Sequence, residues 1–114
     1  MITVYGIPNC DTVKKARAWL TDQGVEHHFH DFKKQGVPEA ELDRWLAALG
    51  WEALINRKGT TWRQLDETVR AGVSDAASAR AVALANPSVI KRPVVQWTDG
   101  ITVGFDAAAW QARL

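Results

Sequence analysis

Apolar residues follow two different spacings along the chain, and the change from one to the other marks where strands and helices are expected. Residues 2–6, ITVYG, form a β-branched and aromatic run that predicts a buried strand followed by a loop. Residues 11–24 carry apolar side chains at helical spacing and end at Gly24. The side chains expected on the buried face of that helix are Val13, Ala16 and Leu20, with Arg17 or Trp19. Residues 25–32 alternate as a second strand, so the chain opens with a βαβ unit whose strands are parallel.

The middle of the chain has helical spacing. Pro38 stands at the start of a helix that Gly50 ends. Its apolar stripe consists of Leu42, Trp45, Leu46 and Leu49. A short helical piece follows, then a turn at residues 56–59, a further helix, and an alanine-rich helix over about residues 75–85.

The C-terminal part predicts a β-hairpin and a last helix. Residues 94–97 and 101–104 have strand patterns on either side of a Thr-Asp-Gly turn, and Asp106 caps a helix after them. Two parallel strands followed by a hairpin give an α/β fold with a four-stranded mixed sheet. Thioredoxin-like domains share this arrangement, which places the end of the first strand at the functional edge. With no linker or repeat in view, we expect one domain over residues 1–114.

Composition narrows the class of protein. Of the 114 residues, 46% are hydrophobic and 24% are charged, as in a folded domain rather than a disordered chain. A net charge of +1 gives no reason to expect nucleic acid or an anionic membrane as partner. No apolar run approaches the ~20 residues that span a bilayer. We therefore expect a cytoplasmic protein whose thiols stay reduced.

The chain contains one cysteine, Cys10. It has no partner for an internal disulfide, so redox chemistry at Cys10 requires a second molecule. Cys10 and the three histidines do not fall at the spacing of zinc ligands, so no metal is expected. We interpret His27, His28 and His30 as strand polarity rather than as a base or metal site.

Cys10 lies between the first strand and the first helix. The helix start, with Asn9 or Asp11 as the expected cap, offers unpaired N–H groups and a partial positive charge that favour a thiolate. Lys14, one turn on, adds positive charge, whereas the carboxylate of Asp11 opposes a second anion. The alternative role of a lone cysteine is that of a small buried hydrophobic side chain. The polar loop around Cys10 favours exposure.

Two short basic turns, NRKG at 56–59 and IKRP at 90–93, lie outside the helical faces. In the expected sheet, Arg92 and Pro93 come just before the third strand and therefore near the end of the first. An arginine there suits a carboxylate, an oxyanion or a sulfur anion. The bond before Pro93 is a candidate cis peptide. Solvated loop charges are the alternative interpretation of these arginines and lysines.

Three segments together resemble the arsenate-reductase-like (ArsC/Spx) branch of the thioredoxin superfamily, and most of all its YffB subgroup. They are YGIPNCDTVKKARAWL, GWEALINRKGTTWRQL and IKRPVV, in the family's order over nearly the whole chain. The resemblance implies a thioredoxin-like core with a helical insertion at about residues 38–85. It also implies that Cys10 is the nucleophilic thiol, that Arg57 and Arg92 are the two family arginines near it, and that Pro93 is the cis-proline.

Departures from the family pattern bear on the activity. The segment VGFDAA holds Gly104 and Phe105 where arsenate reductases of this type carry a further arginine, and Asp11 replaces part of a hydroxyl-rich loop. Val13 lies three residues past Cys10, so the two-cysteine switch of Spx regulators is absent. The chain therefore fits the glutathione-dependent thiol reductases described for the YffB subgroup better than an arsenate reductase, which would have an incomplete anion site here.

The leading hypothesis is a thiol reductase with one nucleophilic cysteine. The Cys10 thiolate attacks a disulfide or an oxidised centre and forms a mixed disulfide, which glutathione or a glutaredoxin resolves. The thiol or disulfide substrate itself is not identified by the sequence. Glutathione is then a co-substrate, and no cofactor is bound tightly. The residues expected to bind glutathione or another anion are Arg57, Arg92, Lys91, Pro93, Lys14, Asn9 and Thr12.

The alternative hypothesis is a non-catalytic, Spx-like adaptor that binds a larger protein. Six tryptophans would favour it if several were exposed, above all Trp51 or Trp97 beside Cys10. The tryptophans that we expect to fill the core instead are Trp19, Trp45, Trp62 and Trp110.

Overall fold

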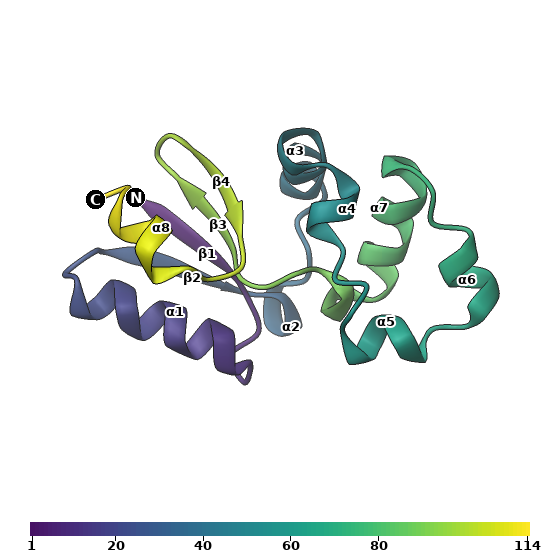
Figure 1. The fold of residues 1–114 in the computed structure, drawn as a ribbon, viewed down its shortest axis with the longest axis horizontal. Coiled ribbons are helices and arrows are strands. Elements are labelled where there is room, and N and C mark those ends of the chain that lie inside the picture. Colours follow the sequence, from purple (N-terminus) through teal and green to yellow (C-terminus); the bar gives the residue numbers. More distant parts are fainter. The chain divides into compact units, whose positions relative to one another are not determined.

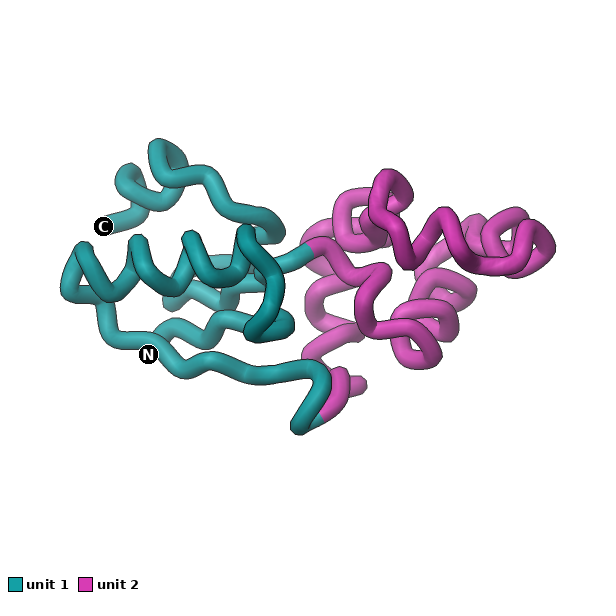
Figure 2. The backbone as a smooth tube through the Cα atoms, turned by 90° about the horizontal axis from the view of Figure 1, so that it is seen from below, with its two compact units in different colours: residues 1–35, 92–114 teal, residues 36–91 magenta.

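The computed structural model describes residues 1–114, and their contacts divide the chain into two compact units (Figure 2). Unit 1 comprises residues 1–35 and 92–114, and unit 2 comprises residues 36–91. The whole sheet belongs to unit 1, and the insertion expected at about 38–85 falls inside unit 2. None of the helices has both the length and the apolar character that crossing a bilayer requires.

Unit 1 is built on a four-stranded mixed sheet with strand order β2-β1-β3-β4 (Figure 1). β1 (Ile2–Gly6) and β2 (His27–Asp31) are parallel because a helix connects them. β3 (Val94–Trp97) pairs antiparallel with β1, and β4 (Gly100–Val103) pairs antiparallel with β3. The mixed sheet predicted from the order of elements is confirmed, and β1 lies inside it between two partners.

Helix α1 (Asp11–Asp22) packs on one face of this sheet with the short helix α8 (Ala107–Gln111) (Figure 1). A further short helix, α2 (Phe32–Gln35), follows β2 directly. The core between α1, α8 and the sheet consists of Val4, Ala16, Leu20, Val95, Trp97 and Trp110. Val13 is also fully buried, so the three aliphatic residues predicted for the inner face of α1 are confirmed there. This packing fixes both ends of the loop that joins β1 to α1.

Unit 2 is helical apart from one isolated bridge between Ile55 and Ile90. Its helices are α3 (Glu39–Leu49), α4 (Trp51–Leu54), α5 (Thr60–Gln64), α6 (Glu67–Ala71), α7 (Ala76–Ala85) and the 3-10 turn η1 (Pro87–Val89). α7 begins at a capping box formed by Asp75 and Ser78. The buried side chains of this unit include Leu42, Trp45, Leu54, Ala79, Ala83 and Ile90. They give unit 2 a hydrophobic core of its own.

Two sequence expectations about element ends are wrong. The N-cap of α1 is Cys10, not Asn9 or Asp11, because the chain stays extended through Cys10 (φ −94°, ψ 125°) and turns helical only after it. β4 runs from Gly100 to Val103 rather than over 101–104, because Gly100 still pairs with Trp97 across the hairpin. The first correction matters for function, since it moves the cysteine onto the cap itself.

Candidate functional site

The thiol of Cys10 is held at the junction between β1 and α1. β1 ends at Gly6, and a turn closes when the Cys10 N–H donates to the Ile7 carbonyl at 3.4 Å. The Cys10 carbonyl then accepts the N–H of Lys14 at 2.9 Å, the first hydrogen bond of the helix. The side chain is partly exposed and forms no regular capping hydrogen bond. The sulfur is thus placed where the first N–H groups of α1 point.

The environment of Cys10 favours the thiolate. Burial raises the pKa of the thiol, but the backbone N–H of Val13 and the side chain of Arg92 lower it by more, with a smaller contribution from the Thr12 N–H. The net result is a pKa below that of an ordinary cysteine. A thiolate rather than a thiol is the nucleophile in disulfide exchange. The Cys10 thiol is therefore both accessible to a substrate and more readily ionised than an ordinary cysteine.

Arg92 and Pro93 enter the site from the segment before β3. Because Val94 pairs with Tyr5 near the end of β1, the residues preceding β3 lie at the same edge of the sheet as the Cys10 loop. The Arg92–Pro93 bond is cis, as the sequence suggested. The ring of Pro93 is fully buried, and its carbonyl accepts the Gly104 N–H at 2.9 Å. Pro93 thus fixes the backbone next to Arg92, and its own buried side chain is not available to a ligand.

The other residues of unit 1 expected at the site lie on the loop and the first turn of α1. Asn9 is exposed in the turn before the cysteine, Thr12 contributes its backbone N–H, and Lys14 is exposed on the helix. The structure brings Cys10, Thr12 and Arg92 together. The binding roles of Asn9, Thr12 and Lys14 stay predictions.

Two of the expected residues, Arg57 and Lys91, belong to unit 2. The Arg57 guanidinium carbon lies 5.2 Å from the centre of the Trp51 ring, and the group is 3.8 Å from a Glu52 carboxylate oxygen. Lys91 is exposed, and its backbone N–H donates to the Leu54 carbonyl at 2.8 Å. Within unit 2, Arg57 is therefore oriented by a ring and a carboxylate and keeps an accessible guanidinium.

Sequence reasoning missed the part that Val13 plays at the site. Its side chain was assigned to the core, correctly, but the hydrogen bond from its backbone N–H is the largest single contribution that lowers the pKa of Cys10. The signal was available, because the third residue after an N-cap is where a capping side chain finds its donor. Placing the cap at Cys10 instead of at Asn9 or Asp11 would have revealed it.

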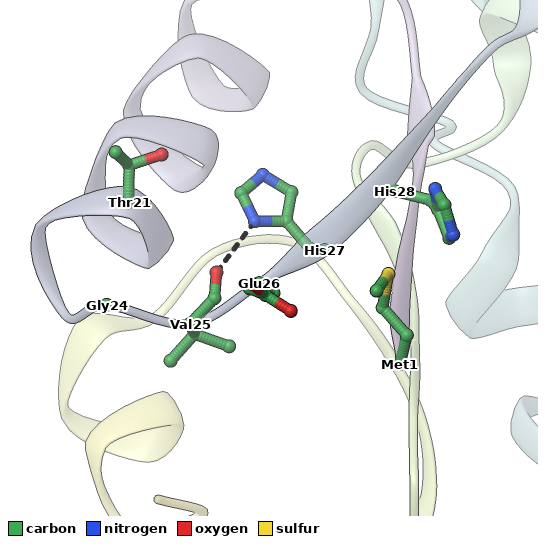
Figure 3. A pocket seen from close by; sticks show the side chains of 7 residues that line it. All are labelled: Met1, Thr21, Gly24, Val25, Glu26, His27 and His28. Atoms are coloured by element: carbon green, nitrogen blue, oxygen red, sulfur yellow. Dashed lines mark hydrogen bonds between the residues drawn. The ribbon is translucent and has the colours of Figure 1, made fainter.

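His27 and His28 lie at the end of β1 away from this site, whereas His30 pairs with Tyr5 near the end of β1 that leads to Cys10. A shallow cavity of about 560 Å³ at the opposite end of β1 is lined by Met1, Thr21, Gly24, Val25, Glu26, His27 and His28 (Figure 3). His27 Nδ1 lies 3.0 Å from the Val25 carbonyl oxygen, a local contact that orients the ring. No three His, Cys, Asp or Glu side chains come together in a way that could hold a metal ion.

A four-stranded mixed sheet, a thiol on the cap of the first helix and a cis-proline before the third strand define a thioredoxin-like domain. The chain belongs to the ArsC family, whose model matches residues 5–113. The resemblance inferred from the three sequence segments is thereby confirmed. The family places the protein among arsenate-reductase-related and Spx-like proteins.

Individual relatives extend over almost the full length. The solved structure of a protein called YffB is 45% identical, with a TM-score of 0.93, and the match covers 98% of this chain and 97% of that one. An arsenate reductase (ArsC) related protein from Brucella melitensis is 53% identical, with a TM-score of 0.76 over 97% and 92% of the two chains. A global transcriptional regulator Spx from Streptococcus pyogenes is 28% identical over 93% of this chain and 79% of its own length.

Proposed function

We propose that the protein is a thiol reductase that works through one cysteine and uses glutathione, free or through a glutaredoxin, as the resolving thiol. The observation that supports it is the partly exposed Cys10 on the cap of α1, with its pKa lowered by the Val13 N–H and Arg92 despite the opposing effect of burial. A cytoplasmic setting fits this chemistry, because thiols there stay reduced.

The reaction needs no bound cofactor. The Cys10 thiolate attacks one sulfur of a substrate disulfide, so that a new S–S bond forms to Cys10 and the other substrate sulfur leaves as a thiolate that takes up a proton. A glutathione thiolate then attacks the substrate sulfur of the mixed disulfide, so that Cys10 leaves as a thiolate and the substrate is joined to glutathione. A second glutathione thiolate attacks the glutathione sulfur of that product and releases the substrate as a thiolate, which takes up a proton. Summed over these three exchanges, one substrate disulfide is reduced to two thiols and two glutathione molecules are oxidised to glutathione disulfide.

Arg92 has two roles in this proposal. Its guanidinium stabilises the Cys10 thiolate, both before attack and when Cys10 leaves. It also offers charge-assisted donors to a carboxylate of glutathione. Asn9, Thr12 and Lys14 on the loop and first helical turn, and the backbone beside Pro93, are further groups proposed to meet the bound peptide. Arg57 and Lys91 of unit 2 are proposed from the family resemblance, and each is testable by its own alanine variant.

Arsenate reduction is supported less well. Gly104 and Phe105 occupy the segment where a third arginine stands in arsenate reductases of this type, and the Gly104 N–H is engaged by the Pro93 carbonyl. Asp11 places a carboxylate beside Cys10, which disfavours a multiply charged oxyanion. The adaptor hypothesis loses part of its expected support, because Trp97 is only 9% exposed and belongs to the core of unit 1. Trp51 is half-buried, and so is Trp62, which was wrongly expected to fill the core, since α5 has no buried residue.

The experiment is the intact mass of the reduced protein after incubation with oxidised glutathione over a series of pH values. We expect one glutathione adduct, formed with a pH midpoint below the ~8.5 of a free cysteine and absent from Cys10→Ser. No adduct, or one that forms only above that pH, would overturn the reductase and leave a protein-binding role. Arg92→Met and Arg57→Ala, tested at the same pH values, then separate the contributions of the two arginines.

A further inference from the structure

Gly6, the last residue of β1, lies against the first turn of α1. A Cβ atom at position 6 would come within 2.9 Å of Val13 Cγ2 and 3.6 Å of Val13 Cγ1, but 3.8 Å from Val13 Cβ. The first of these distances is shorter than a normal carbon–carbon contact, which is about 3.5–4.0 Å. Gly6 is therefore the residue that lets the Val13 side chain approach the strand.

Neither partner can relieve such a contact by itself. Gly6 is paired with Asp31 of β2, and the preceding Tyr5 is paired with both His30 and Val94. Val13 is fully buried, and a β-branched side chain in a helix has essentially one χ1 rotamer. With the strand held from both sides and the valine unable to rotate, a side chain at position 6 displaces the start of α1.

We infer that Gly6 is a positioning residue for Cys10, because it sets the depth at which Val13, and with it the backbone N–H facing the Cys10 sulfur, sits against β1. The inference rests on the proposed thiolate chemistry of Cys10 and adds a residue that touches neither substrate nor sulfur. It agrees with the finding that the hydrogen bond from the Val13 N–H is the largest single contribution that lowers the pKa of Cys10. The charged groups next to the thiol are Asp11 and Lys14 on α1 and Arg92 before β3, and none of them is altered by a change at position 6.

The contact suggests a pair of substitutions that cancel. Gly6→Ala alone creates the clash with the Val13 Cγ2 methyl group. Val13→Ala alone removes both methyl groups but keeps the backbone N–H. In Gly6→Ala/Val13→Ala, only the 3.8 Å contact with the Cβ at position 13 is left, so the helix start returns to its place. Gly72→Ala is the matched control, because a Cβ there would lie 3.4 Å from the Thr68 carbonyl oxygen in unit 2, outside both basic turns.

The test is the rate of Cys10 alkylation by iodoacetamide between pH 5 and pH 10, with folding of each variant checked by circular dichroism. Gly6→Ala should react about three- to tenfold more slowly than the wild type near pH 6 and at the wild-type rate near pH 10, because weakening a hydrogen bond to an ionised group lowers the thiolate fraction without changing the thiolate itself. The double variant should regain the profile of Val13→Ala, and Gly72→Ala should match the wild type. General destabilisation of the fold by Gly6→Ala would not shift the pH midpoint of alkylation. Nor would adding Val13→Ala be expected to reverse such a destabilisation.

Several outcomes would overturn the inference. One is a folded Gly6→Ala variant with the wild-type pH profile, and another is a rate lowered equally at every pH. If Gly6→Ala does not fold, the double variant is compared with Val13→Ala, and a difference between their midpoints would count against the assignment. A wild-type midpoint no lower than that of a free thiol would overturn the proposed function itself. A low wild-type midpoint that Gly6→Ala leaves unchanged would overturn only the role of Gly6.

Discussion

Trp110 attaches the last helix of unit 1 to the sheet. It is the only buried residue of α8, with 2% of its surface exposed, and α8 has five residues. The ring packs edge-on against Trp97, Phe105 and Trp19 at centroid distances of 5.0, 4.8 and 5.8 Å. A helix of that length is not stable alone, so its presence depends on this side chain. Trp110→Ala should therefore detach α8.

The loss follows from burial. Truncation of a buried tryptophan to alanine costs about 3–5 kcal/mol in free energy of unfolding, and three ring contacts place Trp110 toward the upper part of that range. The whole stability of a small domain is about 5–15 kcal/mol, so the variant should be marginal. Trp110→Phe keeps a ring in the cluster and should lose less than half as much. Trp19→Ala, at a half-buried position of the same cluster, should also lose less.

The assay is urea unfolding followed by far-ultraviolet circular dichroism, which does not depend on the tryptophan removed. Hydrogen exchange with mass spectrometry then locates the change, and the amides of α8 should lose protection while those of α7 in unit 2 keep theirs. A loss below about 1 kcal/mol for Trp110→Ala, or full protection of α8 in that variant, would refute the claim that one side chain holds the helix.

Three further predictions concern the site and unit 2. Arg92→Met should slow disulfide exchange at Cys10 near pH 6 by about three- to tenfold, with Arg92→Lys between it and the wild type, as measured by the rate of glutathione adduct formation; equal rates would exclude Arg92 from thiolate stabilisation. The pKa of Cys10 is lower in the folded than in the unfolded chain, so the stability of the wild type relative to Cys10→Ser should rise with pH between the folded pKa and the ~8.5 of an unfolded thiol. Below the folded pKa there should be no such gain. A difference in urea unfolding that stays flat or falls over this range would contradict the direction of the pKa shift. Asp75→Ala breaks the capping box of α7 and should lower the melting temperature of the transition that includes unit 2 by a few degrees, whereas Asp75→Asn should stay close to the wild type.

The sheet and its main helices were predictable because their sequence signals are strong. A β-branched run, a hairpin turn and a helical stripe are each read from spacing alone, and β1, β3 and α1 lie where these signals placed them. Short helices were predicted only where the residues around them mark their position. α5 and α8 have five residues each and were expected after the turn at 56–59 and after Asp106. α2 and α6, with four and five residues, are too short for a periodic pattern and were missed.

At the site, side chains were predicted better than backbone groups. Cys10 and Arg92 were placed at one edge from the strand order, and the structure brings them together. The Val13 N–H and the close approach at Gly6 have no residue-type signature, because every residue carries an N–H and glycine occurs for many reasons. These two features can be predicted only when the first residue of the helix is known. The roles of Arg57 and Lys91 stay predictions from the family resemblance.

The single cysteine sets how an oxidised state of this protein would respond to its surroundings. When one thiol exchanges with glutathione disulfide, one glutathione is released, so the ratio of modified to free protein follows the ratio of oxidised to reduced glutathione. A protein that closes an internal disulfide releases two glutathione molecules. Its ratio of oxidised to reduced protein is therefore inversely proportional to the square of the concentration of reduced glutathione. Dilution of the whole glutathione pool at constant ratio would oxidise the two-thiol protein further and leave this one unchanged. In a chain with Cys10 alone, the modified fraction would thus depend on the ratio of oxidised to reduced glutathione and not on the total glutathione concentration.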